Sequence, residues 1–552
     1  MTSAFLKKSL SLFTRQQTNI LSAALIIMAT VIFSQLLGLV RQRLLVTVFG
    51  ASNTLGVYLA SGRLPDFLFQ IIIAGALSSA FIPVFSDYLV KGKEKEGYAF
   101  ASTLLTLGLA IFFIISLVLF VFAPFFSGLV APGFSSKELI LMGNLMRVTL
   151  AGEMLFIIAS FFSALLQSYN HFLIPGLAAA LYNLGIIIGI LFLAPSVGIF
   201  APAYGVIIGA LLFVIAQIPM VKKVGFRFHI VKVVENKGLA EVFHLMWPRT
   251  LSIAIFQLGT LLTVTLISLL HDAGRNYVIF DYAQTLAFAP VGLFGQTIAQ
   301  AAFPVLSRQK HDLVLFRQTF LSSFFQMLYL VLPVSVLFIV LRIPLVRLIY
   351  GASQFDWQAT VFTGHTLALF AFSLFAQSLI YLVSRGFYAL HDTITPLVIG
   401  AFSTAVMLLL GVCFIFFFHL SIGSIAFAYS ISSIINFLVL FVMLDRKTGG
   451  FTKKTLFFSS AKIFLITFFT AFALYIPIKL LDQLVFDTTK TVELLMLTGI
   501  SSLCGLLLYL LLTWVFNVQE AKPFLLLFKR VGNWREILYS SEEAIEPPHT
   551  GG

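Results

Sequence analysis

Apolar stretches of about 20 residues follow one another along almost the whole chain, and they constrain its fold more than any other feature. A helix of about that length crosses the hydrocarbon core of a bilayer. A soluble protein has about 25% charged residues, whereas this chain is 59% apolar and 10% charged. The sequence therefore predicts an all-α polytopic membrane protein with about 14 transmembrane helices, at 20–40, 54–90, 98–126, 138–167, 173–194, 198–221, 242–270, 277–306, 318–350, 357–384, 394–419, 421–444, 455–481 and 492–516.

The net charge of +13 is explained by membrane topology rather than by nucleic-acid binding. Loops such as "LAPSVGIF" and "YGASQFDWQ" carry almost no basic residues, and the loops that alternate with them are rich in Lys and Arg. Basic loops stay in the cytoplasm, so we predict that both termini are cytoplasmic and that the number of spans is even. The basic residues are Lys91, Lys93 and Lys95; Lys222, Lys223, Arg227, Lys232 and Lys237; Arg308, Lys310 and Arg317; and Arg446, Lys447, Lys453 and Lys454.

The segments outside the spans are interpreted in the same way. Residues 1–19 are basic and amphipathic, and the apolar run behind them is too long for a signal-peptide core, which favours an uncleaved signal-anchor with a cytoplasmic N-terminus. Residues 222–241 are predicted to be a basic cytoplasmic linker, and 517–552 a cytoplasmic tail.

Motifs of covalent chemistry are missing from the sequence. It has no phosphate-binding loop, no dinucleotide-binding glycine pattern and no HExxH motif. Cys413 and Cys504 both fall inside predicted spans, which argues against a disulfide and a metal site. We therefore expect neither an enzyme nor a metal or organic cofactor, with the membrane potential or a coupling ion as the energy source.

Three landmarks recur along the chain at one constant spacing. "FIPVFS" around Pro83 is matched by "AFPVLS" around Pro304, 221 positions later. The same offset places "APGF", ending at Phe134, on "ASQF", ending at Phe355, and "NHFLIP", ending at Pro175, on "HDTITP", ending at Pro396. The chain is therefore predicted to be a tandem repeat.

Each copy of the repeat holds six predicted spans, so both copies insert in the same orientation. We expect an N-lobe at 20–221 and a C-lobe at 242–445, related by a pseudo-two-fold axis along the membrane normal, with the substrate site between them. Two further spans at 455–516 lie outside the repeat. "GIIIG" at 185–189 and "GVIIG" at 205–209 have the spacing of helix-packing motifs.

Ionisable residues inside the predicted spans are the candidates for function, because each costs around 2.5–3.5 kcal/mol in lipid unless it has a partner or a water-filled cavity. Arg41, Arg63 and Arg249 belong to the first two helices of a lobe. Together they would form an anion site, since a guanidinium stays charged and binds phosphate or carboxylate through two donors. Arg43 is a further candidate for the binding site, but near a span end it can instead reach the interface, as can Arg147 and Arg385.

Acidic residues in the spans suggest a second role. Asp66 is three residues from Arg63, so the two can neutralise each other on one helix face, or Asp66 can join the binding site. Glu153 and Asp281 are candidates for ion or proton coupling. His365 is interpreted as a hydrogen-bonded neutral imidazole. Five prolines in the first two spans of each lobe are candidate hinges, because proline removes a backbone hydrogen bond: Pro65, Pro83, Pro248, Pro290 and Pro304.

Several of these segments resemble the MurJ/MviN family of lipid II flippases. They are "SQLLGLVRQRLLVTVFGAS", "RLPDFLFQIIIAGALSSAFIPVFSDYL", "APGF", "YAQTLAFAPVGLFGQTIAQAAFPVLS" and "RGFYALHDTITP", in family order. The family belongs to the multidrug/oligosaccharidyl-lipid/polysaccharide exporter superfamily. The resemblance implies two six-helix lobes in a V shape, and two C-terminal helices at 455–516 that line a groove for a lipid tail.

The resemblance also implies an activity in peptidoglycan biosynthesis, cell-wall biogenesis and cell shape. Its cargo is the polyprenyl-pyrophosphate-linked disaccharide-peptide lipid II, whose diphosphate is held by basic residues of a central cavity. Arg41 and Arg63 match basic positions of the family. This chain departs from the family at Gln35, Gly56 and Thr285, where an arginine, an acidic residue and an arginine are common.

We therefore expect a flippase that moves lipid II from the cytoplasmic to the outer leaflet of the bacterial inner membrane by alternating access. A flippase for another polyprenyl-linked glycan and a cation-coupled small-molecule exporter are the alternatives, and a non-transporting scaffold for cell-wall assembly is a third. The expected partners are lipid II and membrane lipids, with no nucleic acid. A monomer is expected, and association with the cell-wall synthesis machinery is left open.

Overall fold

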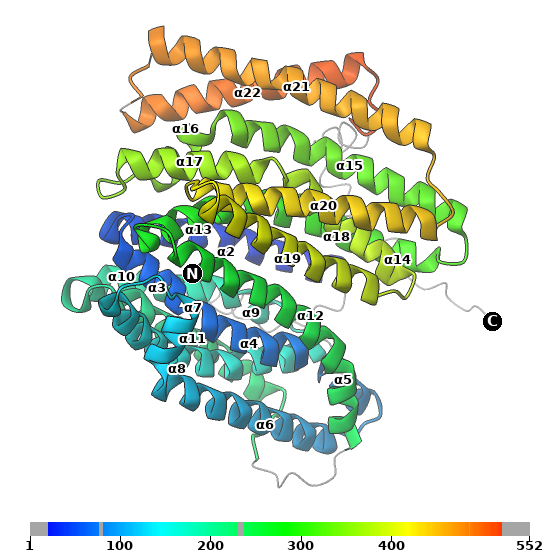
Figure 1. Ribbon diagram of the computed structural model, residues 1–552. Coiled ribbons are helices and arrows are strands. Elements are labelled where there is room, and N and C mark those ends of the chain that lie inside the picture. Colours follow the sequence, from blue (N-terminus) through cyan, green and yellow to red (C-terminus); the bar gives the residue numbers. More distant parts are fainter. Residues whose placement is uncertain (1–19, 77–80, 230–236, 485, 489, 522–552) are drawn as a thin grey trace, which may run out of the picture. The chain divides into compact units, whose positions relative to one another are not determined.

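The computed structural model is helical throughout the residues that it describes, which are 20–76, 81–229, 237–484, 486–488 and 490–521 (Figure 1). Side chains at 20–29, 74–76, 237–249, 252 and 483–484 lie outside the described part. The elements are α2 (Ile20–Phe49), α3 (Asn53–Ser61), α4 (Arg63–Ala76), α5 (Ile82–Val90), α6 (Glu94–Val121), α7 (Ala123–Val130), α8 (Ser136–Ser168), α9 (Leu173–Gly176), α10 (Ala178–Val197), α11 (Phe200–Lys223), α12 (Lys237–Ser268), α13 (Ala273–Pro290), the π-helix η2 (Val291–Gln296), α14 (Thr297–Arg308), α15 (Leu313–Val340), α16 (Arg342–Tyr350), α17 (Trp357–Ala371), α18 (Leu374–Ala389), α19 (Ile394–Phe416), α20 (Gly423–Lys447), α21 (Lys453–Leu484) and α22 (Thr491–Val515).

Eleven helices of the described residues are long and apolar enough to cross a membrane, and the bent pair α17–α18 raises the number to twelve. The sequence predicted fourteen spans. The predicted span at 54–90 is divided among α3, α4 and α5, because the chain breaks at Gly62 and residues 77–80 are not described. The predicted span at 242–270 falls in α12, whose part Ile253–Ser268 is apolar but shorter than a full span. The polytopic helical fold class is confirmed.

The chain forms two compact units. Unit 1 comprises 1–282, 349–366 and 404–428, and unit 2 comprises 283–348, 367–403 and 429–552. The lobes that the sequence predicts at 20–221 and 242–445, and the direction of the axis between them, stay a prediction.

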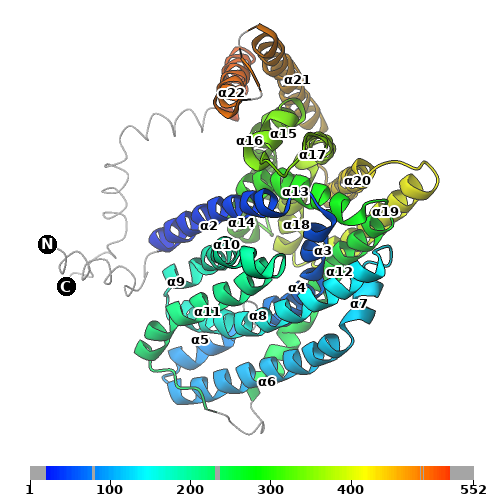
Figure 2. The same ribbon diagram turned by 90° about the vertical axis from the view of Figure 1, so that its left-hand side faces the viewer.

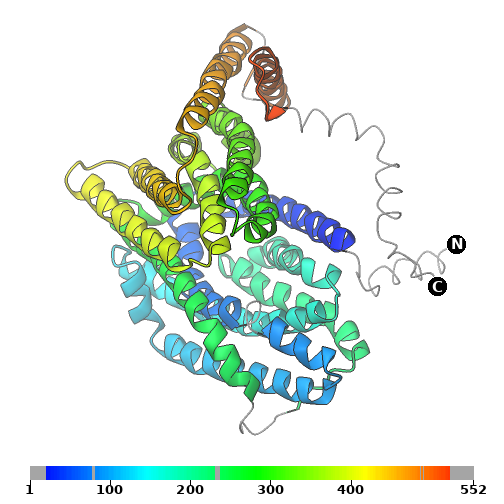
Figure 3. The same cartoon turned by 90° about the vertical axis from the view of Figure 1, so that its right-hand side faces the viewer.

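Unit 1 is built around α8, which packs against α3, α4, α6, α7 and α11 (Figures 1 and 2). A capping box starts α8: the Ser135 hydroxyl accepts from the Glu138 backbone, and the Glu138 carboxylate accepts from Ser135. Close packing of α10 on α11 depends on glycine, since a Cβ at Gly185 would stand 2.1 Å from the backbone nitrogen of Gly209. The two glycine motifs are therefore helix-packing motifs, as expected. Figures 1 and 3 show α12 in green beside α4 in blue.

Unit 2 has α15 at its centre, in contact with α14, α18 and α21. The helices α21 and α22 form an antiparallel pair (Figure 1). A Cβ at Gly505 would lie 2.4 Å from Leu474, so this pair is closely packed too. The Tyr509 hydroxyl donates to the Tyr329 carbonyl at 2.7 Å and ties α22 to α15.

Helix boundaries repeat along the chain at the offset of 221. The helix α8 spans 136–168, and α17 with α18 spans 357–389, although the second copy bends by 43° where the first is continuous. Left-handed backbone recurs as well. Asn170 and His391 have φ of 60° and 59°, and Gly198 and His419 have φ of 57° and 49°. The two halves of the sequence thus fold into the same succession of elements.

The proline positions have different local effects. Pro65 and Pro83 lie in the first turns of α4 and α5, where a missing backbone N–H costs nothing. Pro290 directly precedes the π-helix η2, and Pro304 lies inside α14. The backbone of α12 is continuous through Pro248, whose side chain is outside the described part. Their role as hinges stays a prediction.

Candidate functional site

A partly buried ion pair joins α4 to α13 within unit 1. The Arg63 guanidinium pairs through Nη2 with Oδ1 of Asp281, and its Nε donates to the Tyr277 hydroxyl at 2.6 Å. The guanidinium also lies 5.8 Å from the centre of the Tyr277 ring. Tyr277 and Asp281 are four residues apart, so one face of α13 presents both to Arg63. A single arginine of the first repeat copy is thereby held by two groups of the second.

The second acidic residue of α4 has a different partner. The Asp66 carboxyl group is hydrogen-bonded to the Glu153 carboxyl group on α8. Such a bond requires a proton on one of the two groups. Asp66 lies in the first turn of α4, where the helix dipole favours negative charge. The expectation that Arg63 and Asp66 simply neutralise each other is incomplete, since each bonds to another helix.

Arg41 completes the cluster from α2. Its guanidinium lies 5.9 Å from the centre of the Tyr182 ring on α10, and it is close enough to Asp66 for electrostatic interaction. Its Nε is buried and has no hydrogen-bond partner among the described residues. Among the described residues, this half-buried guanidinium meets a ring face and a nearby carboxyl group, so it has donors left for an anion.

These five ionisable groups, which we call the charged cluster, are close to electrical balance. Two arginines face three carboxyl groups, and the proton between Asp66 and Glu153 removes one negative charge. The cluster does not follow the repeat. At 221 positions from Arg41, Arg63, Asp66, Glu153 and Asp281 stand the uncharged residues Leu262, Gln284, Ala287, Leu374 and Ala60. The repeat preserves the helices but not the ionisable groups, of which four belong to the first copy and Asp281 to the second.

The remaining predicted residues lie elsewhere or outside the description. Arg43 Nη2 donates to the Gly351 carbonyl at 3.4 Å. Arg147 bonds to the Phe120 carbonyl, and the Arg385 guanidinium lies 5.2 Å from the Phe303 ring centre. The side chain of Arg249 is outside the described part of α12, so its place in the site stays a prediction. Among the described residues, no three His, Cys, Asp or Glu side chains could hold a metal ion together.

A buried polar contact next to Arg41 was not found from the sequence. Gln42 is 5% exposed, and its side-chain oxygen accepts from the Tyr350 hydroxyl at 3.0 Å. Its backbone carbonyl accepts from the Tyr282 hydroxyl at 3.1 Å. Glutamine and tyrosine in apolar runs look like ordinary core residues in a sequence. Their pairing across 240 and 308 positions becomes visible only in the fold.

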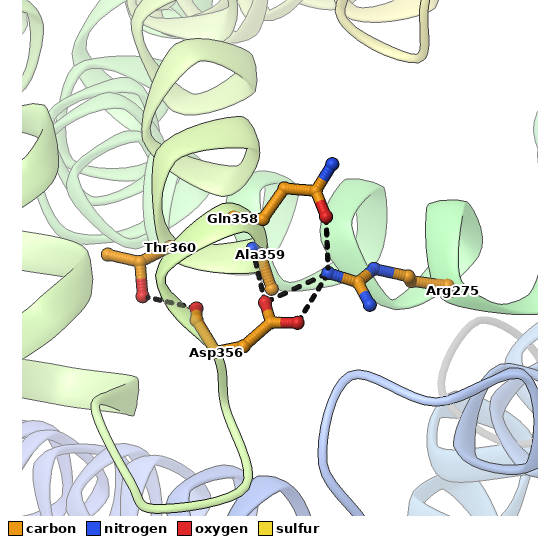
Figure 4. A network of polar contacts seen from close by, with 5 residues as sticks. All are labelled: Arg275, Asp356, Gln358, Ala359 and Thr360. Carbon is orange, nitrogen blue, oxygen red and sulfur yellow. Dashed lines mark hydrogen bonds and ion pairs between the residues drawn. The ribbon is translucent and has the colours of Figure 1, made fainter.

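An exposed ion pair lies near the start of α13 (Figure 4). Arg275 Nη2 contacts both Asp356 carboxylate oxygens, at 2.9 and 2.7 Å, and Gln358 at 3.4 Å. Partial burial alone would raise the pKa of Asp356, but the Ala359 backbone N–H and Arg275 outweigh it and hold that pKa below its usual value. This pair fixes the start of α17 to α13.

Comparison with known proteins places this geometry in a family. The model of the family described as lipid II flippase MurJ matches residues 45–497 of the chain. The chain belongs to this family. A curated MurJ relative is the probable lipid II flippase of Buchnera aphidicola subsp. Acyrthosiphon pisum, which is 29% identical over 76% of this chain and 83% of its own.

Solved structures support the MurJ fold. A lipid II flippase MurJ in an inward closed conformation has a TM-score of 0.75 at 24% identity, covering 89% of this chain and 98% of its own. An inward-facing multidrug resistance transporter of the MATE family has a TM-score of 0.64 at 14% identity, over 77% and 98% of the two chains. The family is one of transporters rather than enzymes. Most of the charged cluster lies inside the matched residues, and Arg41 lies just before them.

Proposed function

We propose that the protein moves lipid II across the bacterial inner membrane, with Arg41 and Arg63 binding the diphosphate of the cargo. The observation that carries this proposal is the buried charged cluster, in which Arg41 has a donor without a protein partner. Membership of the MurJ family gives the class of cargo. Guanidinium groups suit a diphosphate because each presents two donors to adjacent oxygens.

The cargo is carried without covalent change. Its polar head group passes the charged cluster while its polyprenyl tail stays in the bilayer, in a groove that we assign to α21 and α22. Large exposed apolar side chains along these helices, such as Phe468, Leu503 and Leu507, suit a lipid tail. Arg249 is a third candidate contact for the diphosphate, and the prolines are candidate hinges of the helices that move.

The orientation follows from the basic loops. With both termini in the cytoplasm, α2 runs outward, and the start of α3, the start of α13 and the loop before α17 lie at the outer side. The contacts of Asn53, Arg275 and Asp356 then close the outer end of the transport path. We expect a monomer. Association with the cell-wall synthesis machinery is a separate proposal, and it does not depend on the contacts of Asn53 and Arg275.

The hydrogen-bonded pair of Asp66 and Glu153 supports a coupling role for Glu153. A group that must hold a proton in one state and can release it in another is what proton-driven transport requires. Asp281 is engaged by Arg63 in the described state. It is therefore the weaker of the two acidic candidates for coupling.

The alternatives differ in cargo. A flippase for another polyprenyl-pyrophosphate glycan would use the same arginines, and a cation-coupled exporter of small molecules would depend on Glu153 and not on Arg41. Depletion of the protein should cause lipid II to accumulate on the cytoplasmic side. Accumulation of a different precursor would identify another cargo, and accumulation of none would contradict transport of any lipid-linked glycan.

Substitution at Arg41 tests the diphosphate site directly. Arg41→Ala should abolish complementation of a strain that lacks other flippases, while membrane insertion is retained. Arg41→Lys should restore it only in part, because an ammonium lacks the paired donors. Arg43→Ala is the matched control and should complement, since Arg43 lies near the end of α2 and contacts the Gly351 carbonyl. Normal growth with Arg41→Ala would mean that Arg41 is only a structural residue.

A further inference from the structure

Arg63 is occupied before any cargo arrives. Its Nε is bonded to Tyr277 and its Nη2 to Asp281, and both partners come from α13. The Asp281 side chain is 11% exposed and the Arg63 side chain is 28% exposed, so the pair is largely shielded from solvent but still accessible to a ligand. A diphosphate that binds the Nε–Nη2 edge of Arg63 has to displace the carboxylate, because Tyr277 and Asp281 already occupy the donors of that edge.

The same ion pair joins the two repeat copies. Arg63 lies in the second predicted span of the first copy, and Asp281 in the second predicted span of the second copy. The Arg63 guanidinium does not leave Asp281 without a replacement anion, because breaking a shielded ion pair is strongly unfavourable. It exchanges one anion for another instead. Exchange of Asp281 for a ligand would remove the charged link between α4 and α13.

We propose that Asp281 is an internal competitor for the cargo, so that an anionic head group binds Arg63 by displacing Asp281 and thereby releases α4 from α13. This inference rests on the proposed function. It makes Asp281 a specificity-determining residue: a diphosphate carries enough charge to replace the carboxylate, and a monophosphate competes less well. Tyr277 adds to the resting pair, because its hydroxyl accepts a hydrogen bond from Arg63.

Binding measurements on the purified full-length chain test the competition. The probes are undecaprenyl pyrophosphate and undecaprenyl phosphate in lipid nanodiscs. Asp281→Asn removes the competing charge and keeps the side-chain shape, so the diphosphate should bind about tenfold tighter, within the usual range of coupling between sites. The monophosphate should gain more, and the preference for diphosphate should shrink. Transport should fall, because release of α4 no longer depends on cargo.

Two further variants keep the measurement decisive. Asp392→Asn breaks an ion pair outside the charged cluster, with Lys447, and should leave both affinities unchanged. Tyr277→Phe keeps the ion pair and removes one bond to Arg63, so it should give a smaller gain in the same direction. Tyr277→Phe provides a second measurement of the competition if Asp281→Asn fails to fold.

Distances between spin labels measure whether α4 separates from α13. Labels at Gln70 on α4 and Asn276 on α13, in a chain with Cys413 and Cys504 replaced by Ser, should move apart when the diphosphate is added. Asp281→Asn should show the longer distance without ligand. If Asp281→Asn binds no tighter while Arg63→Gln still weakens binding, the competition is refuted and the lipid-binding function stands. If the wild-type chain binds neither lipid, both proposals fail.

Discussion

At the scale of single residues, the charged cluster shows why an acidic residue in a membrane helix needs its partner. Glu153 is 5% exposed and meets another carboxyl group rather than a cation. A hydrogen bond of this kind is stable only with one proton between the groups. Neutral replacements of Glu153 therefore differ in their effect. An amide preserves the hydrogen bond to Asp66, whereas a methyl group leaves the Asp66 carboxyl group without this partner.

We predict that Glu153→Gln folds normally and that Glu153→Ala loses about 1–3 kcal/mol of stability, the cost of an unsatisfied buried polar group. Transport by Glu153→Gln in proteoliposomes should no longer respond to an imposed pH gradient. Glu138→Gln is the matched control, since Glu138 caps the exposed start of the same helix. A pH response that survives Glu153→Gln would exclude Glu153 as the proton carrier, and thermal unfolding in detergent measures the two stabilities.

All five members of the charged cluster could be identified from the sequence, but their pairing could not. Arg41, Arg63, Asp66, Glu153 and Asp281 stand out because charges are rare in apolar runs. Their partners depend on which helix faces lie together. The short spacing between Arg63 and Asp66 pointed to a local pair, whereas Arg63 bonds to a residue 218 positions away. Tertiary contacts decide such pairings.

At the scale of elements, glycine lets α3 approach the start of α13. A Cβ on Gly56 would stand 1.9 Å from the Gly274 carbonyl oxygen, and a Cβ on Gly133 would stand 1.9 Å from the Ser268 carbonyl oxygen. Both are backbone contacts that cannot yield by a side-chain rotation. The sequence marked Gly56 only as a position where the family often has an acidic residue. The fold explains the consequence, because no side chain fits there in this packing.

Gly56→Ala is therefore predicted to disfavour the packing of α3 on α13 by about 1–3 kcal/mol, the usual cost of overpacking. Gly56→Asp should cost more, since its carboxylate would face a carbonyl oxygen. The matched control is Gly108→Ala in α6, where a Cβ meets nothing within 4 Å. Cross-linking between cysteines placed at Thr54 and Asn276 measures the contact. Equal cross-linking in Gly56→Ala and Gly108→Ala would show that the contact tolerates a side chain.

At the scale of the whole molecule, the repeat was the most predictable feature. Three sequence landmarks gave the offset of 221, and helix boundaries and left-handed residues follow the same offset. Periodicity could not predict the breaks within spans. The bend of 43° between α17 and α18 has no counterpart in α8, because Ser373 forms buried hydrogen bonds at the break and Gly152 stands at the equivalent position. The bend depends on side-chain bonding within one copy.

The orientation of the whole chain in the membrane is the last prediction. Phe228 and Thr452 are exposed in basic loops, Ser196 is exposed at the end of α10, and Ser353 is exposed in a loop with almost no basic residues. In a background with Cys413 and Cys504 replaced by Ser, cysteines at Ser196 and Ser353 should react with an impermeant thiol reagent in intact cells. Cysteines at Phe228 and Thr452 should react only after the inner membrane is opened, because Lys and Arg near the spans hold those loops in the cytoplasm. The reverse pattern would place the contacts of Arg275 and Asp356 at the cytoplasmic end, and the direction proposed for lipid transport would have to be abandoned.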